Sequence, residues 1–313
     1  MAHINRILCP IDFSDFSRHA FDRALAIARG TGASVTAVHV APSEATPLST
    51  HIEARAADAF VLSHADLRAL RGELSRFLNV DAITGVSVTC KVVRAPQVAV
   101  KLVAQAQRLP ADLIVMGTHG RSGFQRLVFG SVTERVLRTA MAPVLTVGAK
   151  DQTSADAGLA FKRILCAVDF SDCSLAAWDY ALSLARGAGA TLAIIHVVGA
   201  LPVACDPLMG SPVDLAGYQL AAETFGRERL QALVTAAASK GVIVEPLIVS
   251  GQPHHEILRQ AAAWGSDLIV LGIHGKNPID RLMFGATAEP VVRRAECPVL
   301  TVRAGARAKS AAA

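Results

Sequence analysis

The segment RILCPIDFSD at residues 6–15 returns as RILCAVDFSD at residues 163–172, and this repeat decides how the chain is organised. Three more segments recur in the same order: SVTAVHV at 34–40 as TLAIIHV at 191–197, DLIVMG at 112–117 as DLIVLG at 267–272, and APVLTV at 142–147 as CPVLTV at 297–302. The chain of 313 residues therefore holds two diverged copies of one domain. We expect domains over 1–149 and 161–303, a polar linker over 150–160 and a disordered tail over 304–313.

Short apolar runs alternate with stretches of helical period within each copy. In the first copy this pattern predicts strands over 7–11, 35–40, 86–93, 113–116 and 144–147, and helices over 16–29, 53–78, 98–107 and 131–139. Ser14 or Asp15 is the expected N-cap of the first helix, and Gly30 and Gly32 are expected to end it. The alternation predicts an α/β fold of two tandem Rossmann-like domains, each with a parallel sheet covered by helices on both faces. Such sheets bind ligands at the carboxyl ends of their strands.

Composition narrows the class of protein. Hydrophobic residues make up 52% of the chain and only 5% are aromatic, as expected for parallel sheets buried on both faces. No apolar run approaches the roughly 18 residues of a membrane span, and the net charge of +5 forms no basic stripe interleaved with aromatic residues. The six cysteines include no CxxC pair, and the first nine residues show no signal peptide. We therefore expect a cytoplasmic protein with free thiols that binds neither membranes nor nucleic acid.

A glycine-spaced loop follows the fourth predicted strand. Gly117 ends the strand, Gly120 follows, and after nine more residues Gly130 and Ser131 open the last helix. A glycine at a strand end lets the backbone approach a ligand closely and permits positive φ, and a glycine before a helix exposes free N–H groups that bind anions. We therefore expect this loop to hold phosphates. A ligand-free alternative exists, because Ser131 and Glu134 also fit an S-x-x-E capping box.

The second copy keeps its glycines at the matching positions, which are Gly272, Gly275 and Gly285. Around them it departs from the first copy. Ala286 replaces Ser131 and so removes a hydroxyl, for which Thr287 is the candidate substitute. Pro278 stiffens the loop, and Pro290 falls in the first helical turn, where a missing N–H is tolerated. Because backbone donors survive these changes, we expect the second site to bind nucleotide more weakly than the first.

The Gly-x-x-Gly-x9-Gly-Ser loop after a DLIVMG strand, together with Pro10-Ile11-Asp12 at the end of the first strand, resembles the universal stress protein family. The resemblance covers nearly the whole chain, as a tandem member of the ATP-binding type. It implies a five-stranded sheet of order 3-2-1-4-5 in each domain, with ATP and Mg²⁺ as cofactors. It also implies that the fifth strands, within 143–147 and 298–302, pair in an intramolecular pseudo-dimer, and it leaves a homodimer of the chain open.

The resemblance implies roles for individual residues. Asp12 would meet the adenine or ribose end of the nucleotide, while the loop glycines and the first amides of the last helix would hold the phosphates. The implied nucleotide-binding residues of the first copy are Pro10, Ile11, Asp12, Val40, Met116, Gly117, His119, Gly120, Arg121, Gly130, Ser131, Val132 and Thr133. Those of the second copy are Ala167, Val168, Asp169, Val197, Leu271, Gly272, Gly275, Gly285, Ala286 and Thr287.

No sequence motif predicts a dedicated catalyst. The chain has no GxxxxGK[ST] P-loop, and it shows no Ser-His-Asp or paired-carboxylate spacing. No metal site built from protein ligands is predicted, because the members of each repeated histidine pair belong to separate domains. We expect an ATP-binding stress-response protein that acts as a nucleotide-dependent sensor or regulator. Two alternatives remain open, namely an enzyme that hydrolyses ATP slowly and a protein-interaction adaptor with vestigial nucleotide sites.

Overall fold

The computed structural model describes residues 4–42, 63–119, 130–148, 161–199, 215–273 and 285–305. The chain divides into two compact units, His3–Leu159 and Ala160–Ala313, with Met1–Ala2 grouped with the second. The expected linker at 150–160 lies outside the described residues, as does the tail from 306 onward. Each unit is described by itself below.

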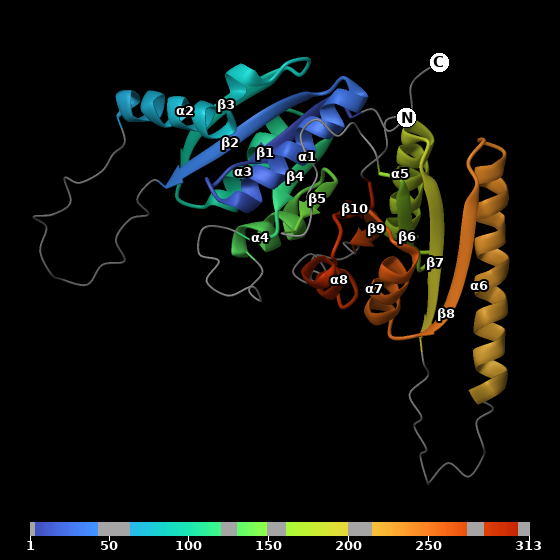
Figure 1. The fold of residues 1–313 in the computed structure, drawn as a ribbon. Coiled ribbons are helices and arrows are strands. Elements are labelled where there is room, and N and C mark those ends of the chain that lie inside the picture. The colour runs from blue at the N-terminus through green and yellow to red at the C-terminus, as the bar shows by residue number, and fades with distance from the viewer. Residues whose placement is uncertain are drawn as a thin grey trace, which may run out of the picture. The chain divides into compact units, whose positions relative to one another are not determined.

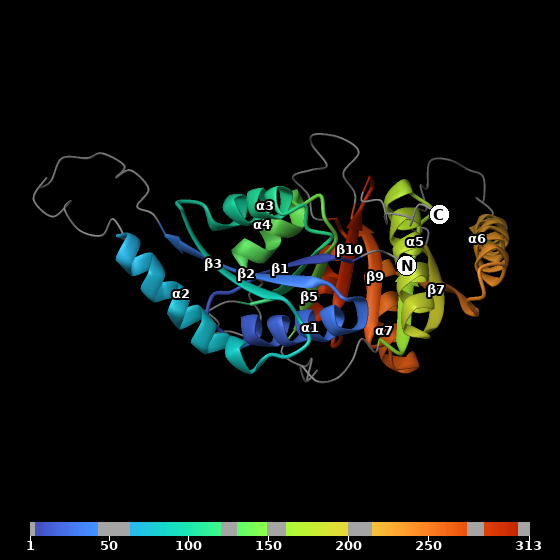
Figure 2. The same cartoon turned by 90° about the horizontal axis from the view of Figure 1, so that it is seen from above.

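The first unit is a five-stranded parallel sheet with helices on both faces. The strands are β1 (Arg6–Pro10), β2 (Ser34–Pro42), β3 (Val88–Ala95), β4 (Leu113–Gly117) and β5 (Val144–Val147). They run in the order β3-β2-β1-β4-β5, which confirms the expected topology (Figure 1). Seen from above, α1 (Asp15–Thr31) and α2 (His64–Leu78) cover one face, and α3 (Val98–Arg108) and α4 (Ser131–Thr139) cover the other (Figure 2). A short 3-10 helix, η1 (Val80–Ala82), follows α2.

The second unit repeats this plan. Its strands are β6 (Arg163–Ala167), β7 (Thr191–Gly199), β8 (Val244–Gly251), β9 (Leu268–Ile273) and β10 (Val299–Arg303), which are parallel in the order β8-β7-β6-β9-β10. Its helices are α5 (Asp172–Ala188), α6 (Leu215–Ala238), α7 (Pro253–Trp264) and α8 (Ala288–Arg294). Within this unit α7 packs against α8, and α6 packs against β7 and β8.

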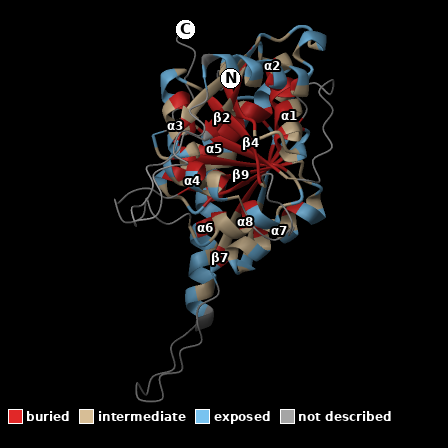
Figure 3. Ribbon diagram, turned by 90° about the vertical axis from the view of Figure 1, so that its left-hand side faces the viewer, coloured by how far each residue is buried: buried red, intermediate tan, exposed pale blue. Residues whose placement is uncertain are grey.

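The central strands form the core of each unit because their aliphatic side chains are enclosed on both faces, whereas the edge strands β3 and β8 are only partly buried. Buried residues are concentrated in the strands, while the outer faces of the helices are exposed (Figure 3). In β1, for example, Ile7, Leu8 and Cys9 are all buried. The continuous apolar runs that predicted these strands are what a parallel sheet covered on both faces requires.

Local signals set the ends of α1 and α5 in the same way. Ser14 is the N-cap of α1 and accepts a hydrogen bond from Ser17 N at 3.2 Å, and Ser171 caps α5 through Ser174 N at 3.3 Å. Both helices end at a glycine in the left-handed region, as expected from the absence of a Cβ. For α1 that residue is Gly32, at φ +73°, whereas Gly30 lies inside the helix.

A carboxylate ties the amino ends of the central strands together in each unit. The Asp112 carboxylate accepts hydrogen bonds from Asn5 N and Arg6 N, both at 3.0 Å. Asp267 accepts from Lys162 N at 2.6 Å and Arg163 N at 3.0 Å. Bonds from backbone N–H groups to an ionised carboxylate are stronger than neutral ones. The aspartate of the D-L-I-V segments therefore fixes β1 against β4, and β6 against β9.

Most expected element bounds of the first copy lie within two residues of those in the structure. The last helix and the fifth strand of the first copy occupy the expected residues. The third strand spans Val88–Ala95 rather than 86–93. The long second helix begins at His64 rather than at residue 53, because Ser63 is its N-cap with an extended backbone and forms a capping box with Asp66. Residues 53–62 lie outside the described residues.

Two cysteines lie at the same position of the central strands. Cys9 in β1 and Cys166 in β6 are fully enclosed and free of disulfides. Burial raises the pKa of both thiols far above the ordinary value. These thiols stay protonated in the folded protein and behave as small apolar side chains.

No helix among the described residues is long and apolar enough to cross a membrane.

Candidate functional site

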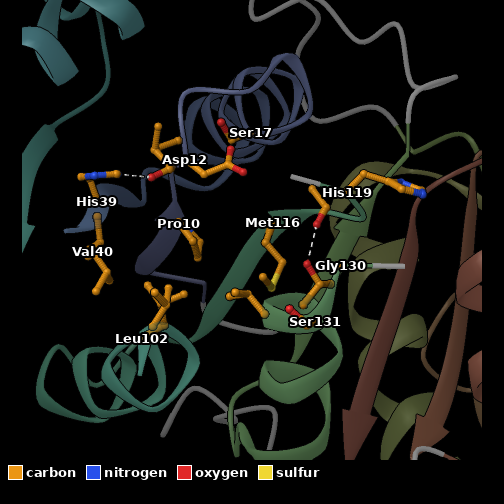
Figure 4. A pocket seen from close by; sticks show the side chains of 16 residues that line it. Pro10, Asp12, Ser17, His39, Val40, Leu102, Met116, His119, Gly130 and Ser131 are labelled. Atoms are coloured by element: carbon orange, nitrogen blue, oxygen red, sulfur yellow. Dashed lines mark hydrogen bonds between the residues drawn. The ribbon is translucent and has the colours of Figure 1, made fainter. Parts of the chain in front are cut away.

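The carboxyl ends of β1, β2 and β4 meet the first turns of α3 and α4 around a cavity of about 360 Å³. This is the sheet edge at which α/β proteins bind ligands. Apolar side chains form the walls, and Figure 4 draws Met116 between Asp12 on one side and Ser131 on the other. The lining residues are Pro10, Ile11, Asp12, Ser17, Val38, His39, Val40, Val98, Leu102, Met116, Gly117, His119, Gly130, Ser131, Val132 and Thr133.

The turn after β1 holds Asp12 in a fixed orientation. One carboxylate oxygen, Oδ1, accepts from Ser14 N at 3.1 Å and from Ser14 Oγ at 2.5 Å. Between them Phe13 adopts φ +63°, a left-handed conformation that is rare for a bulky side chain. Such strain persists only where the surroundings impose it. The Asp12 carboxylate is therefore placed at the cavity wall by the turn itself.

Aromatic packing supplies the restraint that holds Phe13 in this conformation. Its ring lies 4.7 Å from the His39 ring and 5.3 Å from the Phe77 ring of α2, measured between centroids. The His39 Nδ1 is 2.8 Å from Ile11 O, and because that oxygen can only accept, Nδ1 donates (Figure 4). The turn, β2 and α2 are thus linked next to the cavity.

The start of α4 is pinned to the end of β4. Gly130 N donates to Thr118 O at 3.1 Å, and Thr133 Oγ1 donates to Gly117 O at 2.9 Å. The helix begins at Ser131, and Gly130 is its N-cap. The capping-box alternative is therefore wrong, since it needs Ser131 rather than Gly130 at the N-cap.

The first turn of α4 presents donors to the cavity. The amides of Ser131, Val132 and Thr133 belong to a helix start, where N–H groups have no intrahelical partner. All three residues line the cavity. Free amides and the helix dipole together favour an anion at this place.

Gly117 packs closely against α1, and it does not adopt the positive φ that a glycine permits. A Cβ at this position would lie 2.9 Å from Phe16 Cβ and 3.0 Å from the Phe16 carbonyl oxygen. Its φ is not in the left-handed region. Close packing of α1 on the end of β4 requires this glycine, so the residue shapes the cavity by letting α1 approach. At Gly130 a Cβ would make only ordinary contacts, the nearest at 3.4 Å from Thr118 O.

His119 borders the cavity beside the start of α4. Its Nδ1 lies 2.9 Å from Thr118 Oγ1, and its ring centroid is 5.1 Å from that of Phe16. Burial lowers the pKa of His119 below its ordinary value. The imidazole is therefore neutral near neutral pH when no anion is bound.

The second unit has a cavity of about 320 Å³ at the equivalent strand ends. The turn after β6 repeats the first one: Asp169 Oδ1 accepts from Ser171 N at 3.0 Å and Ser171 Oγ at 2.6 Å, and Phe170 has φ +61°. The lining residues are Ala167, Val168, Asp169, Ser174, Ile195, Val197, Pro253, Ile257, Leu271, Gly272, Gly285, Ala286, Thr287 and Ala288.

The helix start in the second unit is built differently. Gly285 lies at φ +95°, whereas Gly130 is extended at φ −65°. The helix α8 begins at Ala288, two residues later than the position that matches Ser131. Ala288 also stands where the first unit has Thr133, so the hydroxyl that pins α4 to β4 is missing.

The structure brings the expected site residues together in the two cavities. All of them that are described line one cavity or the other, while Gly120, Arg121 and Gly275 lie outside the described residues. Sequence reasoning missed the side chains that α1, α3, α5 and α7 add to the walls, namely Ser17, Val98, Leu102, Ser174, Pro253 and Ile257. The available signal was a pair of apolar residues four positions apart at the start of the helix after the third strand of each copy. The pair is Val98 and Leu102 in α3, and Pro253 and Ile257 in α7.

Within the part of the chain that the structure describes, no three His, Cys, Asp or Glu side chains cluster as a metal site.

Comparison with known proteins places the two copies in one family. The model of the universal stress protein family matches residues 3–148 and 160–303. The chain is 35% identical to the universal stress protein YxiE of Bacillus subtilis over 149 residues, which cover 46% of this chain and 99% of that protein. It is 34% identical to the universal stress protein MJ0531 of Methanocaldococcus jannaschii over 146 residues, 46% of this chain and 82% of that protein.

A solved structure shows the same tandem fold. The crystal structure of a universal stress protein from Archaeoglobus fulgidus aligns with a TM-score of 0.68, covering 96% of this chain and 99% of that one. The two sequences are 22% identical, so this likeness concerns the fold alone.

Proposed function

The chain belongs to the universal stress protein family, and from this premise we propose that its first unit binds ATP and that the bound nucleotide regulates a stress response. The observation that carries the proposal is the polarity of the first cavity. Apolar walls, the Asp12 carboxylate and helix-start amides all line this one cavity. The apolar walls complement an adenine ring, the carboxylate complements ribose hydroxyls, and the amides complement a phosphate chain.

The nucleoside would occupy the end of the cavity near β1 and β2. Pro10, Val40 and Leu102 offer apolar surface for a purine, and the Asp12 carboxylate can accept hydrogen bonds from ribose hydroxyls. A cavity of about 360 Å³ falls within the usual range for small-molecule sites. The fixed turn at Asp12 limits the rearrangement needed on binding.

The phosphates would lie at the start of α4. The hydroxyl of Ser131 and the first-turn amides supply neutral donors, and His119 becomes a cation when a nearby anion raises its pKa. Mg²⁺ would neutralise the phosphates, with oxygen ligands drawn mainly from the nucleotide and water.

We propose regulation rather than turnover because the described lining offers no paired carboxylates to activate a water. Slow ATP hydrolysis and an adaptor with vestigial sites are the competing functions. Cytoplasmic location, pairing of the fifth strands and homodimerisation stay predictions from the sequence.

Mass spectrometry of the small molecules released from the denatured full-length protein tests the proposal. We expect ATP or ADP in the extract, and calorimetric titration with Mg²⁺-ATP should then saturate the first cavity. The absence of any adenine nucleotide from the extract, together with no binding on titration, would favour the adaptor. Sustained phosphate release by the purified protein, lost with the same variants that lose binding, would favour the enzyme.

A further inference from the structure

The second unit has another cavity, of about 460 Å³, at the amino ends of its strands. The second half of α7, the turn into β9, the end of α8 and the segment that leads into β10 form this amino-edge cavity. Helices α7 and α8 lie side by side there (Figure 1). None of its described lining residues also lines the cavity that contains Asp169. The lining residues are Leu258, Arg259, Ala261, Ala262, Gly265, Ser266, Ile269, Arg294, Ala295, Glu296 and Cys297.

Two arginines bring positive charge to the amino-edge cavity. Arg259 donates from Nε and Nη2 to Glu256 Oε2, at 3.0 and 2.6 Å, so its Nη1 is left to donate to a ligand. Burial lowers the pKa of His254 in α7, and His255 and Arg294 lower it further. The charge of Arg294, which ends α8, therefore lies against α7. Guanidinium groups bind carboxylates through paired, charge-assisted hydrogen bonds.

The lining also has an unused hydroxyl and a carboxylate. Ser266 Oγ is buried and makes no hydrogen bond to the described part of the chain. A buried polar group without a partner is costly, so a ligand that supplies a partner recovers free energy on binding. Glu296 lies on the segment before β10, and because its carboxylate only accepts hydrogen bonds, it favours an ammonium group in the ligand.

These groups belong to the second copy only. The aligned repeats place small or apolar residues and one threonine at the matching positions of the first copy. Ala104, Ala111, Thr139, Met141 and Ala142 stand where the second copy has Arg259, Ser266, Arg294, Glu296 and Cys297. The first unit forms the same strands and helices without the charged groups, so the shared fold does not require them.

We propose that the amino-edge cavity binds a short acidic peptide that has a free amino group. Its carboxylates would meet Arg294 and the Nη1 of Arg259, its ammonium would meet Glu296, and a peptide group would bond to the Ser266 hydroxyl. A ligand with anionic groups alone would face the Glu296 carboxylate, so the mixed lining favours a ligand that carries both charges. The volume lies within the usual range for small-molecule sites. The inference does not rest on the proposed function, because the nucleotide would bind elsewhere.

Calorimetric titration of the full-length protein with glycyl-glutamate tests the proposal. This dipeptide has one ammonium and two carboxylates. We expect saturable binding, which should be about tenfold weaker for glycyl-glutamine, without the side-chain carboxylate, and for N-acetyl-glycyl-glutamate, without the ammonium. Equal affinity for the three probes overturns the inference. No binding of glycyl-glutamate by calorimetry and equilibrium dialysis, while ATP still binds, overturns the inference and leaves the proposed function in place.

A pair of neighbouring arginines locates the binding. Arg294→Gln should weaken glycyl-glutamate binding by about tenfold to a hundredfold, because a charge-assisted bond is lost. Arg293→Gln is the matched control, since Arg293 is the preceding residue of α8, pairs with Glu289 at 2.9 Å and is not among the lining residues. Equal affinities of the two variants for glycyl-glutamate would overturn the assignment of this cavity.

Ser266→Ala separates binding from stability. The hydroxyl has no hydrogen bond to lose in the free protein, and the first copy has Ala111 at this position. The free energy of unfolding should therefore not fall, whereas the affinity for glycyl-glutamate should fall a few-fold. A variant that loses stability but binds the dipeptide as before would contradict the assignment of Ser266 to the site.

Discussion

Helices α4 and α8 follow equivalent strands, yet α4 begins at the residue after its glycine and α8 begins three residues after its own. The glycines themselves are retained in both units. One difference is the hydroxyl of Thr133, which donates to Gly117 O and is absent at Ala288. Glycine spacing alone therefore does not fix where the helix begins.

The retained glycines also differ in what they do. Gly117 and Gly272 let a helix pack against a strand end, whereas Gly285 provides a left-handed backbone and Gly130 provides neither. A shared sequence pattern thus combines glycines that have different structural roles. Substitutions can separate these roles.

The largest effect is expected for the packing glycines. A Cβ on Gly272 would lie 2.5 Å from the Cys173 carbonyl carbon and 2.6 Å from Ser174 N, both backbone atoms. Gly272→Ala should lower the free energy of unfolding by about 3 kcal/mol, and Gly117→Ala, with contacts near 2.9 Å, by less. Urea unfolding measures both. Gly148→Ala is the control, since a Cβ there has open space, and equal losses for Gly272→Ala and Gly148→Ala would contradict the packing role.

The second effect concerns the donors of α4. Ser131→Pro removes a hydroxyl and an amide at a position where proline suits the backbone, because Gly130 before it is extended and Ser131 is the first helical residue. We expect ATP affinity to fall about tenfold to a hundredfold with little change in stability. Ser131→Ala should lower the ATP affinity less, since the backbone amide remains. Calorimetry with ATP and with adenosine measures both, and an equal loss for adenosine would show that the variant disturbs more than the phosphate end.

A third effect tests the strained turns. At φ +63° glycine is favoured over alanine by about 1 kcal/mol, so Phe13→Gly should be more stable than Phe13→Ala. At positions with negative φ the alanine variant is ordinarily the more stable of the two. The glycine variant should likewise be the more stable one at Phe170. Removing Phe170 should cost more than removing Phe13, because Arg229 lies 5.1 Å over the Phe170 ring. Urea unfolding of the four variants measures their free energies of unfolding. An alanine variant more stable than the glycine variant at either position would show that the backbone there is not strained.

The smallest effect is on the pH dependence of binding. Burial lowers the pKa of His119 in the free protein, and a bound polyphosphate raises it. Bound protein then holds more protons than free protein, so ATP affinity should rise a few-fold as pH falls from about 8 to about 6. His119→Gln should remove this part of the dependence, and adenosine should not show it. Identical pH profiles for ATP in both proteins would exclude His119 from the phosphate end.

Much of the fold could be predicted from the sequence because its signals are local. Continuous apolar runs predicted the buried strands, and the expected bounds of α4 and β5 match the structure. The residues expected at the site lie at or just after the carboxyl ends of strands or open a helix, so parallel topology brings them to one edge of each sheet. The resemblance to a family then supplied the strand order.

The remainder depended on contacts between distant residues. The bond from Thr133 to Gly117 spans sixteen positions, and without it the later start of α8 is not evident from sequence. The role of Gly117 depends on how closely α1 packs, and the left-handed Phe13 depends on rings from β2 and α2. Side chains such as Leu102 reach the cavity only because the crossover places the start of α3 there.

The buried thiols of Cys9 and Cys166 can report local opening of the fold through their reactivity. An alkylating reagent modifies a cysteine only when its sulfur reaches solvent and ionises. The two cysteines occupy the same position of β1 and β6. Their rates of modification therefore report the local opening of the first and the second unit separately. Pulsed alkylation of the unmodified protein, with and without ATP, would show whether ATP slows the alkylation of Cys9, of Cys166 or of both.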